Sequence, residues 1–143
     1  MKSEQQTGKH GEHLAAVALR AAGVEMVERI GTPVRLIPAV DGTFRVVYGD
    51  QVSGDMRGIM PGGRSVLVEC KTILDRNLRW SDMRPHQPER LSEHARLGGI
   101  SLLVWVSSVG VFVMRWPIRG FHAGMGMTLA EAGELSERWR DDD

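Results

Sequence analysis

The amino-acid sequence predicts one α/β domain, a mixed β-sheet with helices on its faces. Three observations support this prediction. The chain has 143 residues, close to the usual size of one domain. Extended segments alternate with helical ones along it. Residues 100–106 form a continuous apolar run, which is typical of a strand buried on both faces. We therefore expect residues 1–143 to share one core and to end in a short acidic tail at 141–143.

Composition and charge bound the class of protein. Hydrophobic residues make up 42% and charged residues 25%, a balance typical of globular proteins. The formal net charge of +0 counts against a nucleic-acid partner, because DNA-binding domains are usually basic. However, residues 131–143 carry a net charge of −4, so the remainder carries +4. Of the 18 basic residues three are lysines, and the excess of arginine reflects either phosphate binding or a composition bias of the source organism.

Nothing in the sequence indicates export or membrane insertion. The first residues lack the apolar centre of a signal peptide, and no apolar run approaches the roughly 20 residues that cross a bilayer. Cys70 is the only cysteine, which excludes an internal disulfide and is typical of a reducing compartment. We therefore expect a cytoplasmic protein with no membrane partner.

Three segments are predicted to be helical. Residues 8–22 have an apolar stripe, with Thr7 as a candidate cap and Gly23 at the end. A second helix runs from Pro85 to Leu97 and stops at a glycine pair, and a third covers residues 128–140. In the first helix, Glu12 shares a face with apolar residues at i+3, i+4 and i+7. This carboxylate is either solvated near the helix start or directed at something in the protein, and the spacing alone favours solvation.

Extended segments with turn signals between them predict the strands. A mixed sheet with helices on its faces accommodates all of them. The predicted pairs are 33–40 with 43–48 around Asp41-Gly42 and 52–60 with 64–72 around Pro61-Gly62-Gly63. Residues 100–106 and 111–116 are predicted as two further strands, separated by residues 107–110.

The second of these hairpins brings two acids together. If Pro61-Gly62-Gly63 forms the loop, Met60 faces Arg64, and counting outward along both strands places Asp55 opposite Glu69. Directly opposed residues of an antiparallel pair have Cβ atoms roughly 5 Å apart. Like charges in that arrangement are destabilising, so structure alone has little reason to place two carboxylates there. A divalent cation would supply a reason.

Residues after Glu69 extend the candidate site. Lys71 points to the same face as Glu69, whereas Val68 and Cys70 point into the core. Magnesium prefers oxygen ligands and keeps several waters, so one or two carboxylates can hold it, and we expect manganese to substitute. Beside such an ion, Lys71 would orient the nucleophile or stabilise charge on a phosphate. The alternative is that Asp55 marks a strand end and that Glu69 and Lys71 belong to an exposed charged stripe.

These residues belong to an ordered set of motifs that resembles a known family. The motifs are GEHLAAVALRAAG, GTPVRLI, SGDMRGIMPGGRSVLVECKT, RPHQPERL, GGISLLVWV and VFVMRW. From about Gly8 to Arg119 the chain resembles PD-(D/E)XK endonucleases, and among them RecU-type Holliday junction resolvases. Two departures are visible. The chain is shorter than typical cellular members, as in a phage-type resolvase, and Thr72 stands where the family often has another acid.

The resemblance implies a restriction-endonuclease-like fold and a bacterial or phage-encoded homodimer that cuts four-way DNA junctions with magnesium. It implies that Glu12 contributes to the metal site and that Gln87 contacts the active site or DNA. We also expect the backbone carbonyl of Cys70 to be a metal ligand. Residues 38–51 occupy the place of the stalk that enters the junction in RecU-like proteins, although here they read as a plain hairpin.

Two further functions remain open. One is a nuclease with another DNA target, such as the VRR-NUC group, which shares the glycine-aspartate, ExK and downstream glutamine pattern. The other is a non-catalytic DNA-binding accessory protein, which the intact acid and lysine set argues against. Trp80 is more simply interpreted as a packing residue than as a platform for a base. The cations that we expect to contact DNA are Lys9, Arg35, Arg45, Arg64, Arg76 and Arg79.

Overall fold

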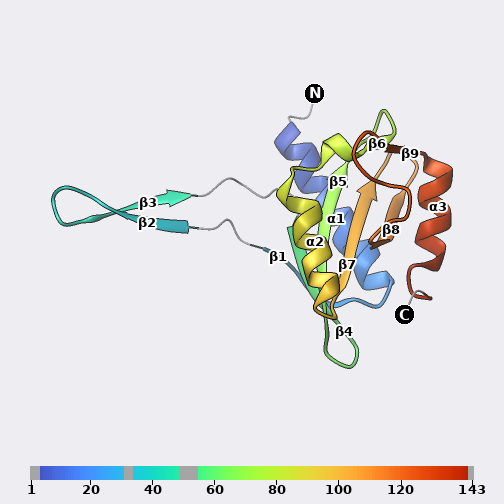
Figure 1. The fold of residues 1–143 in the computed structure, drawn as a ribbon, viewed down its shortest axis with the longest axis horizontal. Helices are drawn as coiled ribbons and strands as arrows, with labels where there is room; N and C mark the ends of the chain where they lie inside the picture. The colour runs from blue at the N-terminus through green and yellow to red at the C-terminus, as the bar shows by residue number, and fades with distance from the viewer. Residues whose placement is uncertain (1–3, 31–33, 49–54, 142–143) are drawn as a thin grey trace.

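The computed structural model describes residues 4–30, 34–48 and 55–141. Its centre is a five-stranded sheet whose strands, in order across the sheet, are β1 (Glu25–Arg29), β4 (Asp55–Met60), β5 (Arg64–Thr72), β7 (Ile100–Val106) and β8 (Val111–Trp116). β5 and β7 run parallel, and the other neighbours run antiparallel (Figure 1). The predicted mixed sheet of an α/β protein is therefore confirmed.

In the described part of the chain, three helices accompany the sheet: α1 (Glu4–Ala21), α2 (His86–Arg96) and α3 (Leu129–Arg138). α1 begins at Glu4 instead of Gly8, so Thr7 lies inside the helix and does not cap it. The start of α3 agrees with the sequence, because Thr128 and Glu131 form a reciprocal capping box. None of the described helices combines the length and hydropathy that a membrane span requires.

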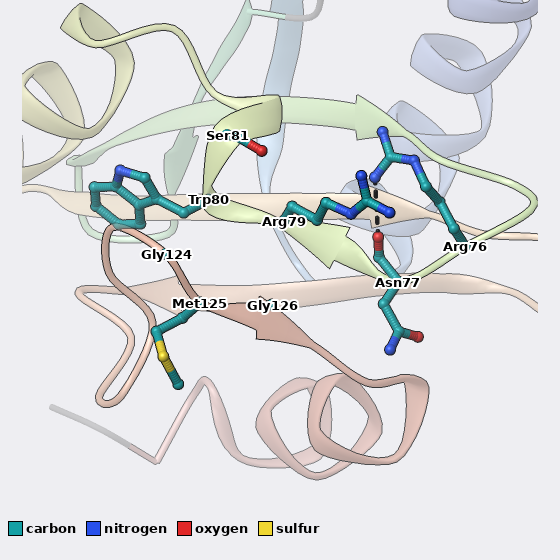
Figure 2. Close-up of a pocket in the computed structure, with 8 residues that line it drawn as sticks. All are labelled: Arg76, Asn77, Arg79, Trp80, Ser81, Gly124, Met125 and Gly126. Atoms are coloured by element: carbon teal, nitrogen blue, oxygen red, sulfur yellow. Dashed lines mark hydrogen bonds between the residues drawn. The ribbon is translucent and has the colours of Figure 1, made fainter.

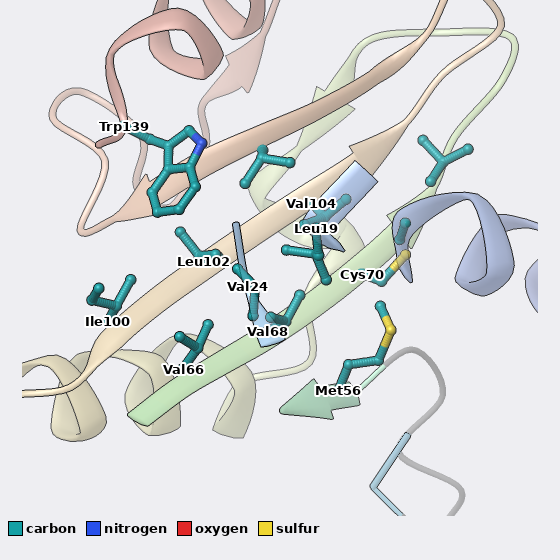
Figure 3. Packing of buried hydrophobic residues seen from close by; sticks show 13 residues of the cluster. Leu19, Val24, Met56, Val66, Val68, Cys70, Ile100, Leu102, Val104 and Trp139 are labelled. Carbon is teal, nitrogen blue, oxygen red and sulfur yellow. The ribbon is translucent and has the colours of Figure 1, made fainter. Parts of the chain in front are cut away.

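The sheet separates two apolar layers, because successive side chains of a strand point to opposite faces. Val66, Val68 and Cys70 of β5 pack on the side of α1, where Leu19 is fully buried (Figure 3). Leu67 faces the other layer, which contains Leu91 of α2 together with Leu103, Trp105 and Met114. β7 is buried along its whole length, as its apolar run predicts. Polar residues at odd positions of β5 therefore face α2.

Three strands of the structure were not expected from the sequence. β1 is a charged edge strand whose residues are mostly exposed, so it has no apolar alternation to reveal it. β6 (Leu78–Arg79) and β9 (Gly126–Met127) form a two-stranded sheet of two residues each, too short for any periodic signal. A 3-10 turn, η1 (Trp80–Asp82), follows β6 and leads toward α2. The segment between β5 and α2 is thus more ordered than its polar composition indicates.

The first predicted hairpin forms a separate two-stranded sheet of β2 (Val34–Pro38) and β3 (Phe44–Tyr48). It projects from the body of the chain in Figure 1. At its tip, the hydroxyl and the backbone N–H of Thr43 both donate to Oδ1 of Asp41, at 2.5 and 3.1 Å. Residues 49–51 of the expected stalk, and 52–54 of the expected strand before Asp55, lie outside the described residues.

Candidate active site

The register of β4 and β5 is the one that the turn predicts. Met60 lies opposite Arg64, and Asp55 lies opposite Glu69. Both carboxylates are buried, with exposed fractions of 1% for Asp55 and 3% for Glu69. Burying two acids side by side is unfavourable unless other groups compensate their charge. The partners of these two side chains therefore decide what the site can do.

Glu69 has two partners on its own face of the sheet. Lys71 Nζ lies 3.5 Å from Glu69 Oε1, as the two-residue spacing predicts. The side-chain amide of Gln87, in the first turn of α2, donates to the same oxygen at 2.9 Å. The orientation of this amide is fixed, because its oxygen accepts the backbone N–H of Arg84 at 2.8 Å, and a backbone N–H can only donate. The structure thus places Gln87 beside Glu69.

Asp55 has a partner that was not expected from the sequence. Arg90 of α2 forms an ion pair and hydrogen bond with Oδ2 of Asp55. A signal for it existed, since Arg90 is three residues after Gln87 and therefore lies on the same face of the helix. The other oxygen, Asp55 Oδ1, is buried and has no hydrogen-bond partner, and no other buried side-chain oxygen or nitrogen of the described residues shares this condition. The hydrogen bonding of the two carboxylates is thus incomplete at Asp55 Oδ1.

The electrostatics of the pair reflect its burial. Burial, and then the neighbouring Asp55, raise the pKa of Glu69 to about 9, and Lys71 opposes this shift only in part. Glu69 therefore holds a proton at neutral pH when no cation is bound. Burial, followed by Glu12 and Glu69, raises the pKa of the Cys70 thiol to about 12, so Cys70 is an unreactive core residue.

A divalent cation fits the residues that are present. Carboxylate oxygens are the ligands that magnesium prefers, and Oδ1 of Asp55 lacks the partner that a buried oxygen normally has. Within the described residues, no group of three or more His, Cys, Asp and Glu side chains gathers at one point. Asp55 and Glu69 would therefore supply the side-chain ligands, with waters or substrate oxygens completing the shell. The contribution of the Cys70 carbonyl stays a prediction.

Glu12 lies on the other side of the sheet, with α1. It forms an ion pair with Arg29 of β1, at 3.3 Å, and its side chain is 14% exposed. The solvated position that its spacing favours is therefore wrong, because Arg29 of the edge strand β1 covers the acid. The adjacent Gly11 packs directly against Thr72, which leaves no room for a side chain. The metal role that the family resemblance implies for Glu12 stays a prediction.

The expected DNA contacts are dispersed over the molecule. Lys9 is exposed on α1, and Arg64, at the start of β5, donates to the carbonyl of Gly98 at 2.9 Å. Arg76 and Arg79, in contrast, line one pocket next to β6 (Figure 2). The side chains of Arg35 and Arg45 lie outside what the structure describes. Of the four cations whose side chains the structure describes, Arg76 and Arg79 are the pair that is brought together.

The chain matches no model of a known protein family and no curated protein. The resemblance to PD-(D/E)XK nucleases therefore stays a prediction that rests on the motifs. The chemistry of the site has to be inferred from Asp55, Glu69, Lys71, Gln87 and Arg90, which we call the carboxylate cluster.

Proposed function

We propose that the protein is a magnesium-dependent DNA endonuclease whose carboxylate cluster hydrolyses phosphodiester bonds. One observation carries the proposal. Two buried carboxylates face each other across β4 and β5, a lysine stands on the same face, and one carboxylate oxygen is buried without a partner. A binding module has no need of such an arrangement, because two opposed buried carboxylates destabilise the fold.

Each residue of the carboxylate cluster then has a role. Asp55 and Glu69 hold the cation, which when bound polarises a phosphodiester oxygen and lowers the pKa of a bound water. Lys71, 3.5 Å from Glu69, orients the nucleophile or stabilises the charge that develops on the phosphate. Gln87 fixes the orientation of the Glu69 carboxyl group. The side chain of Arg90 is 42% exposed, so its guanidinium can leave Asp55 and reach a phosphate.

The proposal extends to the substrate. The projecting β2–β3 hairpin stands where RecU-like proteins carry a stalk, and a four-way junction has room for such an element at its centre. Because a junction offers two symmetric strands, coordinated cutting needs two active sites related by a two-fold axis. We therefore expect a homodimer that resolves four-way junctions, with β8 or the hairpin as the shared surface. A monomer by light scattering would leave the nuclease chemistry intact and remove the symmetric mechanism.

The test compares three DNA substrates of the same sequence: a four-way junction, a flap and a linear duplex. Salt is held constant, because phosphate contacts make affinity strongly salt-dependent. Wild-type protein should cut in magnesium, and chelator or Asp55→Asn should stop cleavage. Glu134→Gln, which removes an exposed acid of α3, is the matched control and should cut normally. Equal cutting of duplex and junction would overturn the junction preference, and cleavage by Asp55→Asn would overturn the site.

A further inference from the structure

A pocket of about 560 Å³ lies next to β6, outside the carboxylate cluster. It is formed by two segments that are distant in sequence, residues 76–81 and residues 124–126. β6 and β9 hold these segments together, with Leu78 paired to Met127 and Arg79 to Gly126. The backbone N–H of Trp80 adds a hydrogen bond to the carbonyl of Met125 at 3.0 Å. Backbone hydrogen bonds between the two segments therefore hold the shape of the pocket.

One end of the pocket is cationic. The side chains of Arg76 and Arg79 lie close together there (Figure 2). Asp82 holds Arg76 with a two-pronged contact, at 2.9 and 2.5 Å, and the carbonyl of Asn77 accepts a third hydrogen bond at 3.0 Å. This arrangement fixes Arg76, on which the charges of Asp82 and of the neighbouring Asp75 both act. The planar guanidinium donors of Arg79 and Arg76 suit a phosphate group, which would exchange for part of the contact with Asp82.

The other end of the pocket is apolar. Trp80 and Met125 lie there, on the far side from the two guanidinium groups in Figure 2. The Trp80 ring packs against Trp116 and Phe121, with ring centroids 5.8 and 5.5 Å apart, so its plane is held in place. The expectation that Trp80 packs is confirmed, yet the ring is only partly buried and also lines the pocket. A fixed, accessible indole is a surface on which a nucleic-acid base stacks.

The pocket lies within reach of the carboxylate cluster. Arg76 is five residues after Lys71, which places the two Cα atoms no more than about 18 Å apart along an extended chain. The same connecting segment continues through Asp82 to Arg84, whose N–H orients Gln87 beside Glu69. A DNA strand of a few nucleotides covers such a span, so the pocket and the carboxylate cluster can contact the same strand.

We propose that this pocket binds a short unpaired stretch of the DNA substrate, with a phosphate at Arg76 and Arg79 and a base against Trp80 and Met125. A base that stacks on a protein side chain cannot stay stacked in a duplex, so the pocket selects DNA with unpaired nucleotides beside the cut. This inference rests on the proposed nuclease function and narrows its substrate class to branched or locally single-stranded DNA.

The test measures binding without cleavage. Fluorescence anisotropy of a labelled ten-nucleotide oligothymidine and of a ten-base-pair duplex is recorded in chelator, at equal salt. Trp80→Ala should weaken binding of the single strand by roughly 10-fold, the loss expected for one stacked base. Trp80→Phe should keep most of the wild-type affinity for the single strand, because phenylalanine also presents an aromatic face. Thermal unfolding of each variant shows whether the packing against Trp116 survives.

Arg79→Ala should weaken single-strand binding and reduce its salt slope by about 0.7, the contribution of one phosphate contact. Arg138→Ala, which removes an exposed arginine of α3, is the matched control and should leave the slope unchanged. Duplex binding should change little in every variant. Single-strand binding at wild-type strength by Arg79→Ala and by folded Trp80→Ala overturns the pocket proposal, as does an equal loss on the duplex. Thymidine monophosphate binding as tightly as the oligonucleotide also overturns it.

The experiments distinguish a failure of the nuclease proposal from a failure of the pocket proposal. A protein that never cleaves DNA but loses single-strand binding on Arg79→Ala keeps its pocket and loses the nuclease function. A protein that cleaves DNA, and whose pocket variants bind and cut branched DNA like the wild type, keeps the nuclease function and loses the pocket.

Discussion

β5 and α2 meet at two polar clusters, and the two differ in kind. At the carboxyl end of β5 lies the charged carboxylate cluster. At the amino end lies a cluster of Ser65, His94 and Ser101, which we call the histidine cluster. Ser101 Oγ donates to the carbonyl of Leu91 at 2.7 Å, so it can only accept from Nδ1 of His94, at 2.9 Å. Nε2 of His94 then accepts the hydroxyl of Ser65 at 3.0 Å.

The histidine cluster is complete without any ligand. Its donors and acceptors match one another, and burial, with a smaller effect of Arg90, lowers the pKa of His94, so the ring is neutral at pH 7. The carboxylate cluster contains formal charges, a carboxyl group with a raised pKa and an oxygen without a partner. A satisfied network holds elements together, whereas an unsatisfied buried one indicates a missing ligand. Within one helix–strand contact, the histidine cluster therefore stabilises the packing, and the carboxylate cluster is the candidate site for chemistry.

The largest effect is expected from Asp55→Asn. The change removes an anionic ligand and the like-charge contact with Glu69, while the half-exposed Arg90 stays solvated. DNA cleavage should become undetectable, and the midpoint of thermal unfolding without metal should stay equal or rise slightly. Calorimetric titration with calcium, which does not require turnover, should show loss of cation binding. Retained magnesium-dependent cleavage would remove Asp55 from the site.

Lys71→Ala should slow cleavage by on the order of 100-fold, because the ammonium group stabilises charge in the transition state. DNA affinity should change much less. Single-turnover rates at saturating protein measure the first effect, and anisotropy measures the second. If affinity collapses while the saturated rate is normal, Lys71 is only a phosphate clamp.

His94→Ala tests whether the histidine cluster has only a structural role. It leaves the buried hydroxyl of Ser101 without one partner, so we expect a loss of about 1–3 kcal/mol in the free energy of unfolding. Urea unfolding at pH 7.5 measures this loss. The folded fraction should cut DNA at the wild-type rate, because His94 belongs to the satisfied network. A loss of cleavage with unchanged stability would assign chemistry to the histidine cluster instead.

A change in the pH dependence of stability is expected from Glu69→Gln in the absence of metal. The pKa of Glu69 is raised from 4.5 to about 9 in the folded protein, so its stabilising contribution is complete below about pH 4.5 and is lost as the pH rises toward 9. Glutamine resembles the protonated acid and does not titrate. Urea unfolding from pH 5 to 9 should therefore show the variant gaining stability relative to wild type as the pH rises. A constant difference would mean that Glu69 is ionised throughout.

The sequence by itself determined the pairing on which the site depends. A loop of Pro61-Gly62-Gly63 sets the hairpin register, and this register places Asp55 opposite Glu69. The two-residue period of a strand then assigns Lys71 to the same face and Cys70 to the core. These are local rules, so they hold wherever the hairpin lies in the fold. Their outcome agrees with the structure because both strands are flanked by unambiguous turn signals.

Only the tertiary structure decided which other groups reach the carboxylates. Arg90 reaches Asp55 because α2 lies across that face of the sheet, and Arg29 covers Glu12 because β1 joins the edge of the sheet. The pocket beside β6 exists because residues near position 78 and near position 126 pair across a long stretch of chain. Such contacts depend on how the elements pack, and packing is set by the shape of the whole core instead of by a local period.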